Sequence, residues 1–257
     1  MRLQERDKQI LSFIARFHCL SSGHISELFG MHIKAVQRRM RKLVSGGLLS
    51  FVMLPSVNVG KSAHLFYLTE DCAKSFGVRY SKPRISLKLG HQQENIKTLV
   101  DIYSQFKGGD VECEVMPEHI LRERYQLKII PDGVFVLKRN NKHALFLLEI
   151  CSGTEIISSP APSYNEDIEK KFLKYVSMFQ ENETKEYEEW FSCNFTRFRV
   201  LFIANNTARL KSISRIISSV DRDGFIWITT MPQLIQSGIK ANIWSVPGAG
   251  ETGKAII

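Results

Sequence analysis

The sequence predicts an α+β protein of two domains, and three observations support this prediction. The chain has 257 residues, 44% of them hydrophobic, which is enough for about two hydrophobic cores. Its first third shows apolar residues at helical spacing, whereas the rest alternates strand-like and helix-like segments. Residues 1–82 hold 13 basic and 5 acidic side chains, while residues 83–257 hold 22 and 21. We therefore expect domains at 1–82 and 83–246 and a flexible tail at 247–257.

Three helices are predicted before the first long strand. A broad apolar face predicts a helix over Glu5–Phe17, and Ser21 is a suitable N-cap for a short second helix that Gly30 ends. The third helix lies within Met31–Gly47. Its apolar residues recur at helical spacing and are expected to face a core: Ile33, Val36, Met40, Leu43 and Val44.

The opposite side of this third helix is basic. Two short helices and a turn that lead into a basic helix are typical of a helix-turn-helix. Apolar strands at Leu48–Leu54 and Ala63–Leu68, joined by a polar loop, add the hairpin of a wing. The sequence therefore predicts a winged helix that binds double-stranded DNA through Lys34, Gln37, Arg38, Arg41, Lys42 and, in the wing, Lys61. The alternatives are an ordinary solvated helix face and a winged helix that binds a protein.

The second domain is predicted to contain a mixed sheet flanked by helices. The expected helices are Leu89–Phe106, Ile168–Gln180 and Thr207–Val220. The expected strands are Asp110–Met116, Lys128–Leu137, His143–Cys151, Arg197–Ala204 and Gly224–Thr229.

Other features exclude several classes of protein. No apolar run approaches the length of a membrane span, and the N-terminal residues are too polar for a signal peptide, so a cytoplasmic protein without a membrane partner is expected. The five cysteines are widely spaced and include no Cys-x-x-Cys pair, which indicates neither a disulfide framework nor a zinc site.

Two carboxylates in the second domain are candidates for chemistry. Asp132 follows Pro131 early in one predicted strand, and Glu149 lies near the end of the next. A hairpin can bring such carboxylates within reach of one divalent cation, and their oxygen atoms suit Mg²⁺ or Mn²⁺. Glu94, on the preceding helix, is a further candidate ligand. The alternative is that Asp132 is a turn residue and that Glu149 pairs with a nearby Arg or Lys.

In this order of elements, the domain resembles the restriction-endonuclease-like core of the PD-(D/E)xK nuclease superfamily, which has Asp on one strand and Glu-x-Lys on the next. Here the triplet is Glu149-Ile150-Cys151, so the lysine is replaced by Cys151. A thiol cannot supply the cation that stabilises negative charge on a phosphate. The resemblance implies that a lysine of the following helix would have to take that role: Lys170, Lys171 or Lys174.

Motifs in both halves of the chain add a wider resemblance. They are ERDKQILSFIARF, RRMRKLVSGGLL, LFYLTEDCAKSFG, GHQQENI, KIIPDGVFVL, FLLEICSGT, KKFLKYVSMF, FRVLFIANNTARL and FIWITT, in this order. Together they resemble the replication-relaxation family of plasmids, phages and integrative elements over most of residues 5–246. Cys151 also departs from that family's usual pattern, in which an acidic residue follows Glu-x.

The resemblance implies a DNA-binding protein of a mobile genetic element that acts in plasmid replication, DNA relaxation or mobilisation, with a degenerate nuclease-like domain. Implied partners besides DNA are a relaxase or replication initiator and a second copy of the chain. Two alternatives stay open from the sequence: a metal-dependent DNA endonuclease and a transcriptional repressor.

Overall fold

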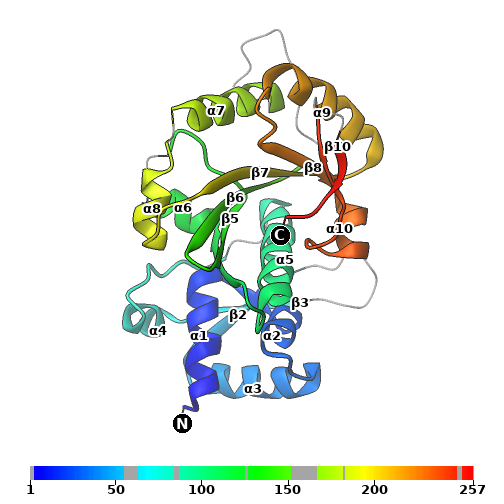
Figure 1. Ribbon diagram of the computed structural model, residues 1–257. Helices are drawn as coiled ribbons and strands as arrows, with labels where there is room; N and C mark the ends of the chain where they lie inside the picture. The colour runs from blue at the N-terminus through cyan, green and yellow to red at the C-terminus, as the bar shows by residue number, and fades with distance from the viewer. Residues whose placement is uncertain are drawn as a thin grey trace. The chain divides into compact units, whose positions relative to one another are not determined.

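The computed structural model describes residues 3–54, 63–83, 87–124, 127–151, 167–181, 183–247 and 251–256. The chain divides into two compact units, 1–104 and 105–257 (Figure 1). This division differs from the predicted boundary at residue 82, because most of helix α5 (Leu87–Phe106) belongs to unit 1. The buried Gln93 of α5 donates a hydrogen bond to Sγ of Cys19 (3.3 Å), and the ring of Tyr103 packs edge-on against Phe13.

Unit 1 combines helices with a small antiparallel sheet. Before α5, its elements are α1 (Glu5–Phe17), β1 (Leu20–Ser21), α2 (Ser22–Phe29), α3 (Ile33–Ser45), β2 (Leu49–Leu54), β3 (Ala63–Leu68) and α4 (Glu70–Ser75). The three strands are ordered β1-β3-β2, with β2 and β3 paired from Leu49↔Leu68 to Leu54↔Ala63. The β2–β3 loop, which contains Lys61, lies outside the described residues.

The helix limits follow from local chemistry. The Ser21 hydroxyl accepts a hydrogen bond from the backbone N–H of His24 (3.2 Å) and caps α2. Gly30 ends the same helix in the left-handed conformation, with φ of 60°, which favours glycine.

The core-facing side of α3 agrees with the predicted stripe except at its first residue. Val36, Met40 and Leu43 are fully buried, and Val44 is half-buried. The prediction for Ile33 is wrong, because its side chain is 36% exposed. Ile33 directly follows the N-cap residue His32, so it begins the helix at the edge of the packed surface.

Unit 2 is built on a mixed seven-stranded sheet of order β10-β9-β8-β7-β6-β5-β4. Its strands are β4 (Glu112–Pro117), β5 (Gly133–Arg139), β6 (Lys142–Ile150), β7 (Arg197–Ala204), β8 (Ile226–Thr230), β9 (Trp244–Val246) and β10 (Glu251–Lys254). Its helices are α6 (Glu118–Arg124), α7 (Ile168–Gln180), α8 (Lys185–Phe191), α9 (Thr207–Val220) and α10 (Met231–Ser237). Strands β6, β7 and β8 run parallel, and the other neighbouring strands are antiparallel. The fold is therefore α+β, as the sequence predicts.

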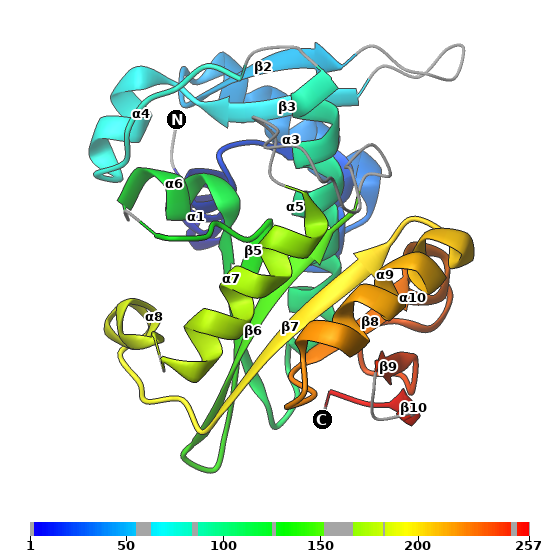
Figure 2. The ribbon, with the colours of Figure 1, turned by 90° about the horizontal axis from the view of Figure 1, so that it is seen from above.

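Helices α7 and α9 lie along one face of this sheet (Figure 2). Their apolar residues join one core with the inward-facing residues of β5 to β8, and the ring of Phe172 on α7 meets Phe202 on β7 edge-on at 5.3 Å. The β5–β6 hairpin turns through Asn140 and Asn141, both at positive φ, as a two-residue hairpin turn of this kind requires.

Several predicted limits need correction. Strand β5 begins at Gly133 rather than Lys128, so Asp132 precedes the strand instead of lying within it. The sequence did not indicate α6, α8, α10 or β9, and β10 lies within the predicted tail. None of the five cysteines forms a disulfide bond, and all five lie within the described residues. No helix of the described residues is long and apolar enough to cross a lipid bilayer.

Candidate functional site

The exposed side of α3 carries a cluster of basic residues. Helical spacing places Lys34, Gln37 and Arg41 on one side, with Arg38 and Lys42 next to them on the flank. All five side chains are exposed. Among the described residues none of the four cations forms an ion pair, and Arg41 Nε donates only to the Gln37 carbonyl oxygen (3.4 Å). The helix therefore presents unneutralised positive charge to solvent.

Arg39 has a different role from its basic neighbours. Its guanidinium donates two hydrogen bonds to the carboxylate of Asp7 on α1. Side-chain exposures are 20% for Arg39 and 2% for Asp7. The same carboxylate accepts the backbone N–H of Gln4 (2.6 Å) and so caps α1. The Asp7–Arg39 pair therefore joins α1 to α3, a role that no local sequence pattern indicates.

Electrostatics at Asp7 agree with this geometry. Burial on its own raises the pKa of the carboxyl group, but the hydrogen bonds from Arg39 and Gln4 and the nearby charge of Arg39 outweigh it. The pKa of Asp7 is consequently below its ordinary value of 3.8, and the group is ionised at neutral pH.

In unit 2, the predicted carboxylates lie at one end of the β5–β6 hairpin. Asp132 Oδ2 accepts the backbone N–H of Ile150 (2.7 Å), the residue after Glu149. Glu149 is 2% exposed, and its two oxygens accept hydrogen bonds from the Lys171 ammonium and the Tyr175 hydroxyl. Lys171 and Tyr175 are one turn apart on α7, so the cluster fastens this helix to the sheet.

Burial and charge act in opposite directions on Glu149. Desolvation raises the pKa of its carboxyl group to about 7; the Lys171 charge opposes this shift, and the charge of Asp132 adds to it. The pKa of the Tyr175 hydroxyl is raised well above its ordinary value by burial and by the Glu149 charge. Tyr175 is thus a neutral donor. The sequence analysis did not identify it, although its spacing of four residues from Lys171 puts both on one helical face.

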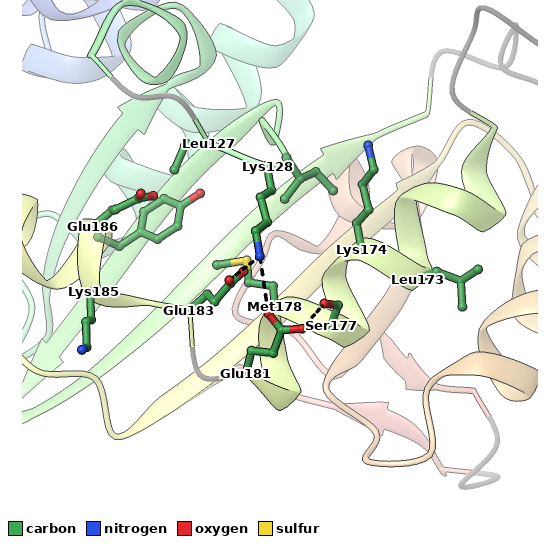
Figure 3. Close-up of a pocket in the computed structure, with 12 residues that line it drawn as sticks. Leu127, Lys128, Leu173, Lys174, Ser177, Met178, Glu181, Glu183, Lys185 and Glu186 are labelled. Carbon is green, nitrogen blue, oxygen red and sulfur yellow. Dashed lines mark hydrogen bonds and ion pairs between the residues drawn. The ribbon is translucent and has the colours of Figure 1, made fainter.

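The other lysines of α7 lie elsewhere. Lys170 pairs with Asp167, the N-cap residue of the helix (3.3 Å). Lys174 lines a groove of about 820 Å³ beside α7 and α8 (Figure 3). In this groove Lys128 pairs with Glu183 and, at 3.4 Å, with Glu181. Of the three candidate lysines, it is therefore Lys171 that contacts Glu149.

The predicted metal ligands do not form a built site. The described residues contain no group of three His, Cys, Asp or Glu side chains placed to hold a metal ion. Glu94 is an exposed residue of unit 1, whereas Asp132 and Glu149 belong to unit 2. Both oxygens of Glu149 already accept hydrogen bonds, one of them from a cation. The residues as arranged therefore fit Mg²⁺ or Mn²⁺ poorly.

Comparison with known proteins gives one family. A family model described as replication-relaxation matches residues 11–192. No curated protein matches the chain.

Solved structures give distant similarities. A structure of restriction endonuclease FokI bound to DNA has a TM-score of 0.32 and 11% identity, and another structure of FokI has 0.34 and 12%. Each match covers 91% of this chain, but only 44% and 43% of the FokI chains. This chain thus spans less than half the length of these structures.

We expect Arg39→Ala to destabilise unit 1 by about 3 kcal/mol at neutral pH, because it leaves the buried Asp7 carboxylate without its cation. The difference from wild type should shrink as the pH falls through the lowered pKa of Asp7, since protonation removes the charge that the pair stabilises. All three tryptophans lie in unit 2, at positions 190, 227 and 244. The urea midpoint of Arg39→Ala should therefore be lower than that of wild type when unfolding is followed by circular dichroism. When unfolding is followed by tryptophan fluorescence, the two midpoints should be equal. A shift of equal size in both signals would contradict a role confined to unit 1.

We expect the stability of unit 2 to fall as the pH rises from about 4.5 to about 7, because the folded state keeps the Glu149 proton over this range and the unfolded state does not. The change attributable to this group is about 3 kcal/mol. Glu149→Gln cannot titrate, so this pH dependence should disappear from its urea unfolding followed by tryptophan fluorescence. Glu181→Gln, the same change at an exposed residue that follows α7, is the control that should retain it. Equal pH profiles for wild type and Glu149→Gln would show that Glu149 is ionised throughout.

Proposed function

Because this chain belongs to the replication-relaxation family, we propose that it binds double-stranded DNA through unit 1 and acts in the replication, relaxation or mobilisation of a mobile genetic element. The observation that carries the proposal is the basic side of α3. Its four exposed cations have no carboxylate partner among the described residues, and phosphates are the natural counter-charge for such a surface. A relaxase or replication initiator and a second copy of the chain are the further partners we propose.

We propose that unit 1 is a winged helix. The order of its elements supports this: three helices, a turn at Gly30 between α2 and α3, and then the antiparallel β2–β3 hairpin, which β1 extends. In such a fold, the helix after the turn enters the major groove and the hairpin lies against the backbone. Helix α3 would then contact base edges through Lys34, Gln37 and Arg41, while Arg38 and Lys42 on its flank and the wing residue Lys61 would contact phosphates.

An endonuclease is the second candidate, and one observation favours it. Lys171 brings a cation from α7 to Glu149, which compensates for the lysine that Cys151 replaces. The burial of Glu149 and the absence of a three-residue metal site in the described part of the chain count against it. We therefore propose that unit 2 is a nuclease-like scaffold without efficient cleavage.

The double variant Arg38→Ala/Arg41→Ala tests DNA binding. On a duplex selected from a random pool for tight binding, the variant should lose about 1–3 kcal/mol of binding free energy for each removed side chain that contacts a guanine. On a duplex of random sequence, the loss of binding free energy should be smaller. Fluorescence anisotropy titrations at fixed salt measure both affinities. Lys74→Ala is a matched control, because this exposed lysine of unit 1 is paired with Glu70 (3.0 Å). Unchanged affinity in the double variant would overturn the assignment of α3.

A nicking assay tests the endonuclease. We expect no efficient cleavage of supercoiled plasmid by wild type with Mg²⁺ or Mn²⁺, and nearly unchanged DNA binding by Asp132→Ala and Glu149→Ala. Weak activity, if it occurs, should require Asp132, Glu149 and Lys171 but not Lys174. Cys151→Lys should raise it by adding a cation to the triplet. Robust cutting by wild type that Asp132→Ala abolishes would establish the enzyme instead.

A further inference from the structure

Unit 1 has a second basic feature besides the exposed side of α3. A hollow of about 380 Å³ lies between the start of α1 and the flank of α3, two segments that lie side by side in unit 1 (Figure 1). Its charged lining consists of Arg6 and Asp7 from α1 and Arg38, Arg39 and Lys42 from α3. Four cations and one carboxylate therefore surround a concave space.

The Asp7–Arg39 pair leaves the other three cations available. Because Arg39 already neutralises Asp7, the net charge of the hollow rests on Arg6, Arg38 and Lys42. All three side chains are exposed, and none forms an ion pair within the described chain. Like charges held together in a concave site raise the local concentration of anions. The hollow is thus suited to an anion with several oxygens.

We propose that this hollow binds a phosphate of the DNA backbone and that Arg6 is a DNA-contacting residue outside α3. The inference rests on the DNA binding proposed above and adds a site to it. Guanidinium groups match phosphate oxygens with two parallel hydrogen bonds, and Arg6 and Arg38 supply two of them from facing helices.

Helix dimensions support a backbone phosphate over a base as the ligand. A helix with its side chains is about 10–12 Å across, and the major groove is about 12 Å wide. Residues on the flank of a helix inserted there therefore meet the sugar-phosphate wall, not the base edges. Arg38 and Lys42 lie one turn apart on the flank of α3 that faces α1. Arg6 on α1 therefore extends the phosphate contact of this flank along the same DNA strand.

Arg6→Ala in the full-length chain is the test. The phosphate contact predicts a loss of affinity of about 3- to 10-fold on selected and random duplexes alike. The slope of log affinity against log salt concentration is negative, and it should become less steep by about 0.9, the contribution of one phosphate. Arg6→Lys keeps the charge and should retain the slope while losing part of the affinity. Circular dichroism and the thermal midpoint establish that each variant is folded.

Lys8→Ala is the matched control. It removes the same charge from the same helix, but Lys8 lies outside the hollow and is paired with Glu5 (3.2 Å), so affinity and slope should match wild type. If Arg6→Ala behaves like Lys8→Ala while Arg38→Ala/Arg41→Ala loses binding, the hollow is not a phosphate site and the proposed function stands. If wild type binds no duplex, both proposals fail.

Free phosphate is the competing ligand. If the hollow binds free phosphate instead of DNA, inorganic phosphate at constant ionic strength would raise the thermal midpoint of wild type but not of Arg6→Ala. The two proteins would then bind DNA equally well. That pair of results would overturn the backbone contact.

Discussion

One buried carboxylate determines how unit 1 presents its positive charge. Asp7 accepts the backbone N–H of Gln4 in the first turn of α1 and binds the guanidinium of Arg39 from α3. An ionised group with 2% exposure must be paired, since an unpaired charge in a poorly solvated site is strongly destabilising. The pairing fixes the rotation of α3 about its axis. With Arg39 turned toward α1, helical spacing turns Lys34 and Arg41 outward and leaves Arg38 beside the hollow. The pairing of Arg39 with Asp7 thus determines which basic residues of α3 are available to a ligand.

Unit 2 uses a buried carboxylate for a different purpose. Glu149 lies under α7, where Lys171 and Tyr175 occupy its two oxygens. A carboxylate that binds a metal ion has to be ionised and to have an open coordination position. Glu149 meets neither condition well, because burial raises its pKa to about 7 and α7 covers it. The cluster therefore links α7 to the sheet. This agrees with the alternative given by the sequence analysis, in which Glu149 is the partner of a nearby Arg or Lys.

Much of this architecture could be predicted from the sequence because long periodic segments carry their own signal. Helix α7 and strand β7 have the predicted limits, and the stripe of α3 fails only at Ile33, where the helix starts. Helices α6, α8 and α10 have seven residues each, about two turns, which is too short for a period of 3.6 to be recognised. The contacts of the candidate sites were harder to predict. Asp7 and Arg39 are 32 residues apart, and Glu149 and Tyr175 are 26 apart, so their meeting depends on tertiary packing that no local pattern encodes.

The charged residues of the two units therefore differ in character. Lys34, Arg38 and Arg41 form no ion pair within the described residues, and a cluster of like charge is mildly unfavourable in the absence of a ligand. Such a cluster is best explained by a polyanionic partner. The cluster of unit 2 has the opposite character, because Glu149 of β6 is paired with Lys171 of α7 and Asp132 accepts the backbone N–H of Ile150. A residue set that is satisfied within the fold needs no ligand to explain it. The exposed cations of α3, which form no ion pair within the described part of the chain, thus indicate a ligand more strongly than the buried carboxylates of unit 2 do.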